Sequence, residues 1–290
     1  MPLRSDIVGQ ALEPFELTVS PRMILAFSSV IGEIANSAFD DTSTDFSASP
    51  LFCVRPEWQF VLSARRQNLG LAADEAVRGV HAGQYTRFQS RLRPGSRIRV
   101  TGSIVAVRKT RAGALTTTQM ETSDIATGTL IATTSSDGMY RGVGLTGDDN
   151  VHSGIQWPGT ATPRTERPTE TRVPLDRWFA HRYTECADIW NPIHTEQRVA
   201  KGAGLPGTIV HGTALWALAG KTIADAYRGG DTRALKALGG RFSAMVTAGT
   251  AITIRHARAV DDVSRVAFSV LNSDGQVAVS NGLALLDRPT

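Results

Sequence analysis

The hydrophobic pattern near the start of the chain predicts one short strand and two helices. Residues 14–19 are interpreted as a short strand. Ser20 and Pro21 have the pattern of an N-cap and a first helical residue, and the apolar-rich stretch after them predicts a helix to about Gly32. A second helix is predicted over residues 56–69. Residues 36–50, between the two helices, are small and polar and predict a loop.

The pattern then changes, from Val80 to Tyr140, to segments that are rich in β-branched residues and partly alternate between apolar and polar. Such segments predict strands whose successive side chains lie on opposite faces of a sheet. The turns between them are predicted at residues 93–95, 111–113 and 126–128. We therefore predict an antiparallel meander in this part of the chain.

The second half repeats the order of strands and turns found in the first half. The matching segments are residues 87–107 with 241–260, and residues 114–136 with 264–287. Gly95 and Gly249 have the same place in the first pair, and Asp274 and Gly275 form the hairpin turn of the last segment. This weak internal repeat predicts two units of the same architecture.

The chain therefore divides into residues 1–143 and residues 173–290, joined by residues 144–172. That joining segment is rich in Gly, Pro, Thr and Arg without periodicity, so we expect a linker. The length of 290 residues accommodates two domains of ordinary size. In each unit a curved antiparallel sheet is expected to wrap one helix, which gives an α+β fold.

Several chemically capable side chains gather between two predicted helices in the second half. Asn191 and Pro192 predict a turn or a helix start, because Asn caps free amides and Pro fits the first helical position. A short helix is expected over residues 195–201. His194 would then lie beside a helix N-terminus, where the helix dipole favours neutral imidazole. Neutral imidazole can accept a proton from water.

A second helix is predicted to begin near His211 and Gly212 and to continue to about Tyr227. It is apolar nearly all round, so we expect it to be buried. Gly212 lets another group approach a free backbone N–H, and such a donor can polarise a carbonyl oxygen.

These residues resemble the signature of MaoC-like, (R)-specific enoyl-CoA hydratases and dehydratases, whose pattern is Ser-Gly-Asp-x-Asn-Pro-x-His, a helix, and Ile-x-His-Gly. The matching residues are Asn191, Pro192, Ile193, His194, Ala200, Gly204, Ile209, Val210, His211 and Gly212. The resemblance implies a double hot-dog fold, with two curved sheets joined into one. It also implies that the second unit carries the chemistry and that the degenerate first unit widens the acyl pocket.

The chain departs from this signature at the catalytic carboxylate. Ungapped alignment puts Ile189 at the family's Asp and Asp188 at its Gly. Either a one-residue bulge presents Asp188, or Glu185 substitutes, or the chemistry has changed. We expect His194, Asp188 and Gly212 to be catalytic, with a narrow preference for Asp188 over Glu185 as the partner of His194. Asn191, His211, Glu185 and Tyr183 are expected to shape the substrate site.

The function implied by the resemblance is the addition or removal of water across the 2,3 bond of an acyl thioester. The missing Ser-Gly-Asp motif leaves two alternatives: an isomerase or cyclase of the same fold, or a non-catalytic partner subunit. The substrate would be an acyl-CoA or an acyl-carrier thioester. No cofactor is expected, because coenzyme A is part of the substrate. We expect a homodimer.

Composition limits the other classes of function. A net charge of +4 over 31 basic and 27 acidic residues does not indicate a nucleic-acid partner. No apolar run is long enough to span a bilayer, no secretory signal is visible, and no spacing suggests a metal site. Two cysteines, Cys53 and Cys186, suit a reducing compartment, so we expect a cytoplasmic protein. Five arginines could meet coenzyme A phosphates or only solvate a linker: Arg164, Arg167, Arg172, Arg177 and Arg182.

The remaining histidines have no partner that the sequence identifies, and no role is assigned to them. They are His81, His152, His181 and His256.

Overall fold

One antiparallel sheet of eleven strands forms the body of the protein in the computed structural model, which describes residues 2–66, 71–72, 75, 78–152 and 163–288. The strands of the first half are β1 (Leu3–Arg4), β2 (Phe15–Thr18), β3 (Gly79–Phe88), β4 (Arg97–Thr110), β5 (Gly113–Asp124) and β6 (Leu130–Arg141). The later strands are β7 (Leu145–Thr146), β8 (Asn150–Val151), β9 (Thr169–Pro174), β10 (Leu235–Phe242), β11 (Ala251–Arg258), β12 (Arg265–Leu271) and β13 (Val277–Leu286).

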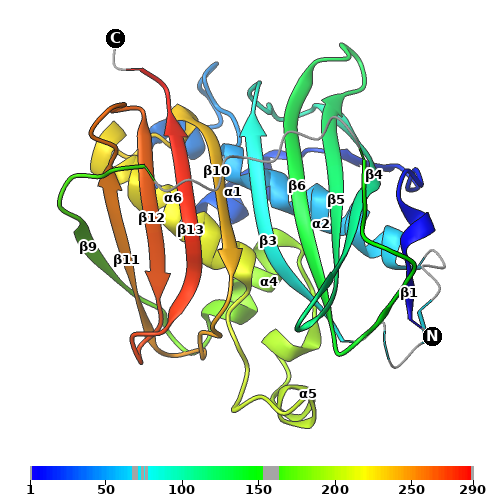
Figure 1. The fold of residues 1–290 in the computed structure, drawn as a ribbon. Helices are drawn as coiled ribbons and strands as arrows, with labels where there is room; N and C mark the ends of the chain where they lie inside the picture. Colours follow the sequence, from blue (N-terminus) through cyan, green and yellow to red (C-terminus); the bar gives the residue numbers. More distant parts are fainter. Residues whose placement is uncertain (1, 67–70, 73–74, 76–77, 153–162, 289–290) are drawn as a thin grey trace.

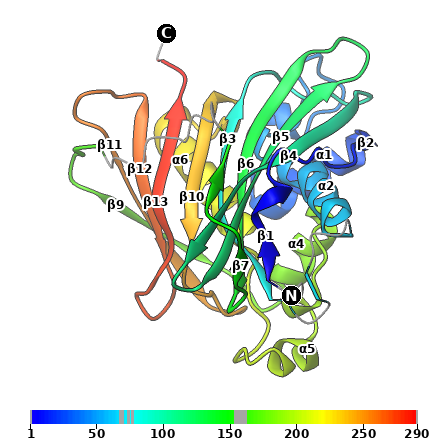
Figure 2. The same ribbon diagram turned by 45° about the vertical axis from the view of Figure 1, so that its right-hand side comes forward.

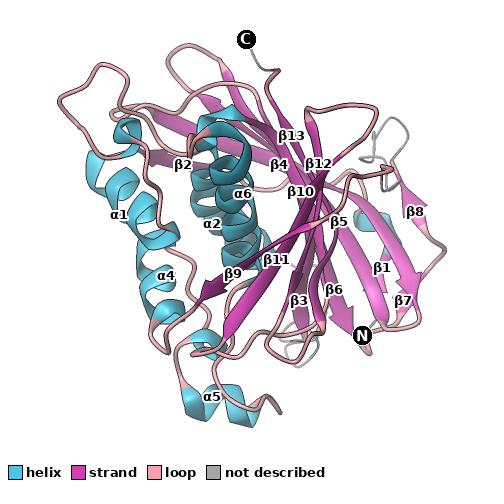
Figure 3. Cartoon of the chain, turned by 90° about the vertical axis from the view of Figure 1, so that its left-hand side faces the viewer, coloured by secondary structure: helices cyan, strands magenta, loops and turns pink. Residues whose placement is uncertain are grey.

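The helices lie together on one side of this sheet (Figure 3). They are α1 (Pro21–Ile31), α2 (Val54–Arg66), α4 (Phe179–Ala187), α5 (Gln197–Gly202) and α6 (Gly212–Arg228). Short 3-10 turns are η1 (Ser5–Ile7), η2 (Asn36–Ala38), η3 (Pro50–Cys53), η4 (Pro192–His194) and η5 (Thr232–Ala234). The predicted α+β class is confirmed, and α1, α2, α5 and α6 overlap the four predicted helices. Residues 67–69, the end of the second predicted helix, lie outside the described residues.

The two halves meet where β3 pairs with β10, at the centre of the sheet (Figure 1). Outward from this junction the order is β3, β6, β5, β4, β2 on one side and β10, β13, β12, β11, β9 on the other. Each half therefore has the same strand connectivity, and the two half-sheets form one continuous sheet. This confirms the double hot-dog architecture that the internal repeat predicted.

Matching residues fix which positions of the two halves are equivalent. Gly95 and Gly249 both have a left-handed backbone, with φ of 84° and 88°, at the turn before β4 and β11 respectively. Three residues later, Ile98 and Ile252 are each fully buried on the helix side of the sheet. A non-glycine residue is strained at such a turn, so the repeated glycine marks the same backbone geometry in both halves.

A largely apolar core lies between the helices and the sheet. Helix α6 is buried along most of its length, with Trp216 and Ile223 fully buried, as its apolar sequence predicted. Helix α1 has the predicted cap, because Ser20 Oγ accepts a hydrogen bond from Met23 N–H, and it ends at the left-handed Gly32. These elements hold the chain segment between α4 and α6 at one end of the sheet.

The expected linker contains more structure than its composition indicated. Strand β7 pairs in parallel with β1 (Figure 2), and β8 pairs with β4. Strand β9 forms the outer edge of the second half-sheet, as β2 does for the first. Part of the expected linker, residues 169–172, therefore pairs with the second half-sheet, because backbone pairing decides this edge and composition does not report it. Residues 153–162 lie outside the described part of the chain.

Candidate active site

The loop between α4 and α6 begins with a left-handed helix cap. Helix α4 ends at Ala187, and Asp188 has a φ of 55°. The next residue, Ile189, donates its backbone N–H to the carbonyl oxygen of Thr184 at 3.0 Å and is buried. Asp188 thus occupies the glycine position of the signature, and Ile189 occupies the position of its acid. Asp188 closes the helix as a left-handed cap, a backbone conformation that glycine favours, and the choice between Asp188, Glu185 and a changed chemistry stays a prediction.

Asn191 turns the chain into η4. Its Oδ1 accepts a hydrogen bond from Ile193 N–H at 3.3 Å, and Pro192 is the first residue of the turn. The predicted cap is therefore present. Helix α5 begins only at Gln197, two residues later than predicted, so His194 ends a 3-10 turn and is not placed by an α-helix dipole.

His194 is oriented so that one ring nitrogen is available as a base. Its Nδ1–H donates to the carbonyl oxygen of Ile209 at 2.8 Å, which leaves the lone pair on Nε2. Burial lowers the pKa of His194 to about 4. The imidazole is therefore neutral at physiological pH, as the sequence predicted, but desolvation is the cause.

His211 supports His194 from behind. The two rings stack with centroids 3.6 Å apart and an angle of 26° between their planes. His211 is buried, and its Nε2 donates to the carbonyl oxygen of Ile189 at 3.0 Å and lies 3.2 Å from Thr184 Oγ1. Desolvation and the neighbouring His194 hold the pKa of His211 well below its usual range. It links the site loop to the start of α6.

The N-terminus of α6 offers backbone donors beside these histidines. Within the described residues, neither Gly212 N–H nor Thr213 N–H donates to a protein acceptor. The ring of Phe242 packs against Gly212, with ring atoms 3.1 Å from where a Cβ would stand. A Cβ at residue 212 would require the Phe242 ring to move by a few tenths of an ångström, so glycine lets this ring pack closely against the helix start.

The predicted carboxylates do not bond to His194 in this structure. Asp188 forms an ion pair with Arg55 of α2 at 3.3 Å, and its side chain is 52% exposed. Its carbonyl oxygen accepts from Gln59 at 2.6 Å. Glu185 is exposed on α4. Among the described residues, the side-chain hydrogen bond of His194 is to a carbonyl and none is to a carboxylate.

Tyr183 is fully buried under the loop, with its ring centroid 5.1 Å from that of His211. Burial raises the pKa of its phenol. Cys186 is partly buried, and burial raises the pKa of its thiol as well, which disfavours a nucleophilic thiolate. Both residues therefore contribute to packing around the site.

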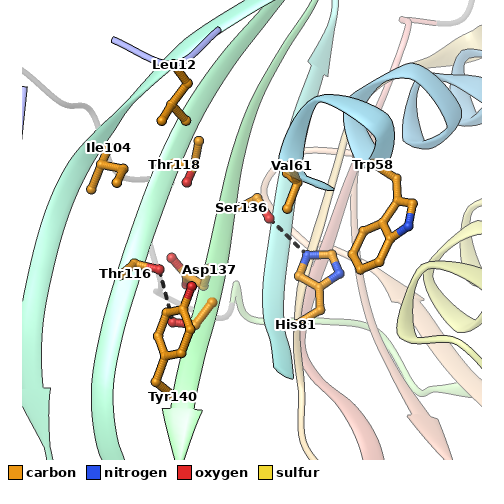
Figure 4. A pocket seen from close by; sticks show the side chains of 11 residues that line it. Leu12, Trp58, Val61, His81, Ile104, Thr116, Thr118, Ser136, Asp137 and Tyr140 are labelled. Carbon is orange, nitrogen blue, oxygen red and sulfur yellow. Dashed lines mark hydrogen bonds between the residues drawn. The ribbon is translucent and has the colours of Figure 1, made fainter. Parts of the chain in front are cut away.

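A cavity in the first half adjoins this site, although the sequence assigned no role to it. His81 of β3 lies opposite Trp58 of α2, and Ser136 of β6 bonds to the His81 ring (Figure 4). The His81 ring centroid is 4.8 Å from that of Phe242, whose other contact is Gly212. The cavity is open to solvent on one side and has a volume of about 50 Å³, which is room for a small group. The alternation of residues along the strands indicates which side chains share a face of the sheet. Only the folded structure shows that these side chains line a cavity.

Other features of the site region bear on its partners. Arg182 pairs with Asp176 at 2.6 Å, and the Arg177 guanidinium lies over the exposed Trp178 ring at 4.5 Å. Two of the five arginines thus have protein contacts of their own.

No group of three metal-ligating side chains occurs among the described residues. In the same residues, no helix combines the length and apolar character needed to span a membrane.

Comparison with known proteins agrees with this geometry. The family described as MaoC like domain matches residues 160–272. A fatty acid synthase beta subunit of Emericella nidulans is 30% identical over 137 residues, which is 46% of this chain and 7% of that protein. An enoyl-CoA hydratase of Mycobacterium tuberculosis, ChsH3, is 30% identical over 103 residues, which is 35% of this chain and 36% of that protein. The chain thus spans a minor part of each relative.

Solved structures share the whole fold. A MaoC-like dehydratase from Phytophthora capsici superposes with a TM-score of 0.83 and 20% identity, over 98% of both chains. A Mycobacterium tuberculosis protein described as a double hotdog fold superposes with a TM-score of 0.61 and 13% identity, over 95% of this chain and 96% of that one. At these identities the likeness concerns the fold.

Proposed function

We propose that this chain, whose residues 160–272 match the MaoC like domain family, adds or removes water across the 2,3 bond of an acyl thioester. One observation carries the proposal: the lone pair of His194 Nε2 lies beside the N-terminus of α6, which has free N–H groups. Hydration needs these two features, a base for water and donors for the thioester oxygen. The family match and the relatives named above support the same class of reaction.

In the hydration direction the thioester carbonyl would accept hydrogen bonds from Gly212 N–H and Thr213 N–H. These donors stabilise the negative charge that grows on the oxygen as C2 gains enolate character. His194 Nε2 removes a proton from water while the water oxygen bonds to C3. The electron pair of the C2–C3 double bond moves towards C2 and the carbonyl, and C2 then takes up a proton.

The proton for C2 is the step that Ile189 makes unusual. With a buried isoleucine at the position of the acid, we infer that His194 acts alone and returns the proton it took from water. Water and proton then add to the same face of the double bond, because one base serves both carbons. Asn191 and His211 hold the loop and the ring in place.

The same isoleucine favours a second candidate, an isomerase or cyclase that rearranges an acyl thioester without water. A single neutral histidine suffices to move a proton between two carbons. A non-catalytic partner subunit is the third reading. In all three cases we propose coenzyme A or an acyl carrier as the thioester portion, with no separate cofactor, and a homodimeric protein of the cytoplasm.

The test is incubation with a panel of enoyl- and 3-hydroxyacyl-CoA thioesters, followed by mass spectrometry, in H₂O and in D₂O. Gain or loss of one water, with deuterium at C2 on the face that receives oxygen, supports hydration by a single base. A rearranged product of unchanged mass supports isomerisation. No reaction with any thioester, by a protein shown to be folded, contradicts both enzymatic readings.

A further inference from the structure

The wall of the first-half cavity combines apolar side chains, among them Leu12, Trp58 and Ile104, with several polar ones. Hydroxyl groups of Thr116, Thr118 and Ser136 lie on two neighbouring strands, and His81 lies across from them (Figure 4). A site for a plain alkyl chain is lined mainly by aliphatic and aromatic side chains. The apolar part of this wall comes instead from the helix and from the far strand.

The second half shows that the fold itself does not require these hydroxyls. Ile98 and Ile252 are equivalent positions, so the pairing of neighbouring strands identifies equivalent residues elsewhere in the two half-sheets. One such set is a row of three side chains that runs across three neighbouring strands in each half. The equivalent rows are Gln84, Ser136 and Thr118 in the first half and Leu238, Ala284 and Val266 in the second. The second row is fully buried and apolar. The first-half row is therefore polar where the second-half row is apolar, and two of its members, Ser136 and Thr118, line the cavity.

These hydroxyls retain capacity for a ligand. Thr118 Oγ1 has no partner among the described residues, although its strand position faces the cavity. Ser136 Oγ bonds to His81 Nε2 at 3.1 Å and, as a hydroxyl, has further donor or acceptor capacity. Thr116 Oγ1 makes a long bond of 3.3 Å to the Gly138 carbonyl. A partly dehydrated hydroxyl without a partner is unfavourable, so a polar ligand group is better accommodated here than a methylene chain.

The cavity also lies where the acyl group of the proposed substrate would extend. Phe242 joins the two regions, since its ring contacts Gly212 at the start of α6 and His81 at the cavity. Helix α2 joins them again: Arg55 and Gln59 bond to the site loop, and Trp58 between them lines the cavity. A thioester held at Gly212 would pass Phe242 and place its distal carbons beside the hydroxyl wall.

We propose that the substrate carries a hydroxyl or keto group on the part of its acyl chain beyond the reacting carbons, and that Thr118 and Ser136 select this group. The inference rests on the proposed function for the direction of the acyl chain. It identifies the substrate class as oxygenated acyl thioesters instead of plain fatty acyl thioesters.

The experiment compares pairs of enoyl-CoA thioesters of equal length, one with an alkyl chain and one with a hydroxyl group moved stepwise along it. The wild type should show a kcat/KM at least about tenfold higher for one oxygenated position, since a site that bonds a substrate hydroxyl rejects the analogue without it. Thr118→Val and Ser136→Ala, which copy the second-half row, should each lower that preference about five- to tenfold and leave kcat/KM for the alkyl substrate unchanged or higher.

Ser135→Ala is the matched control, because Ser135 is the next residue of β6 and points to the opposite face of the sheet. Ser135→Ala should leave kcat/KM unchanged for both the oxygenated and the alkyl substrate. Binding of saturated, unreactive acyl-CoA pairs, measured by calorimetry on the same four proteins, separates this inference from the proposed reaction. If the protein turns over none of the thioesters but still binds the oxygenated ligand more tightly, and Ser136→Ala removes this preference, the pocket assignment is supported and the proposed hydration is refuted. Equal or better use and binding of the alkyl series would overturn the pocket assignment whatever the reaction.

Discussion

Replacing Glu57 with glutamine should make the protein more stable at neutral and alkaline pH. Glu57 lies in α2 against the sheet and is 3% exposed. Its carboxyl accepts from Thr134 Oγ1 at 2.6 Å, and Gln84 Nε2 lies 3.5 Å away, but no Lys or Arg of the described residues forms an ion pair with it. Burial raises the pKa of Glu57 from an ordinary 4.5 to about 8. The side chain is therefore protonated in the folded protein at pH 7.

The pH dependence follows from this raised pKa of Glu57. Between about pH 4.5 and 8 the folded state holds one more proton here than the unfolded state, so its stability falls as pH rises. At roughly 1.4 kcal/mol per pH unit, the loss is about 3 kcal/mol at pH 7 and about 5 kcal/mol above pH 8. Glutamine keeps the shape and the neutral charge, so Glu57→Gln should remove this loss.

The assay for Glu57→Gln is denaturant unfolding of both proteins at half-unit steps from pH 5 to 9. The difference in free energy of unfolding should grow with pH and level off above about 8. Since α2 also carries Trp58 and the two residues that bond the site loop, activity should be lost at lower pH in the wild type than in the variant. The argument that Glu57 is buried as a neutral acid would be refuted if the difference in free energy of unfolding did not depend on pH. It would also be refuted if the variant were less stable than the wild type at pH 8.5.

Three further predictions concern the site itself. His194→Ala should lower kcat by about a hundredfold or more, as expected for loss of a general base. Asp188→Asn should change kcat only a few-fold, because the Asp188 carboxylate is half exposed and paired with Arg55. Steady-state kinetics of both variants would reverse this assignment if Asp188→Asn lowered kcat more than His194→Ala did. The wild-type kcat/KM should stay level from pH 8 down to about 5.5, because protonation of His194 removes the base only as pH falls through about 4; a titration centred near 6.5 would contradict this. Gly212→Ala should raise KM and lower kcat together by displacing the Phe242 ring, with circular dichroism unchanged, and wild-type kinetics in this variant would argue against the role of the helix start.

Sequence patterns predicted much of the fold because they report local preferences. Ser20 and Asn191 act as caps where they were expected, and Gly95 and Gly249 occupy left-handed turns. The edge strand β9 was missed because its short, mostly polar sequence carries no strong alternation, and only pairing with β11 makes it a strand. Local composition cannot report a partner that lies about 80 residues away.

The site was predicted in part for a similar reason. The motif placed His194, His211 and Gly212 together, since all three follow from a turn and a helix start. The motif did not decide which residue supplies the acid. Asp188 or a glycine can form the same left-handed helix cap, so the backbone pattern does not depend on where the carboxylate is. The cavity needed the fold, because Thr118 and Ser136 become neighbours only through strand pairing.

The first half contains the acid that the second half lacks. Gly32 is its left-handed cap, and the following residue, Glu33, donates its N–H to the carbonyl of Ser28 at 3.0 Å, as Ile189 does to Thr184. Glu33 is therefore the structural equivalent of Ile189. It is buried, its carboxyl accepts from Thr232 Oγ1, and burial raises its pKa.

Glu33 nevertheless cannot serve His194. Its partner Thr232 lies just before β10, whereas Phe242, beside the candidate site, ends that strand. A strand of eight residues separates its ends by roughly 23 Å. The two copies of the loop are thus at opposite ends of the sheet, one with an acid and the other with a histidine. Since His194 has no described hydrogen bond to a carboxylate, we expect the C2 proton to come from solvent, directly or through His194, or from the substrate, and the solvent-isotope experiment separates a solvent proton from a substrate proton.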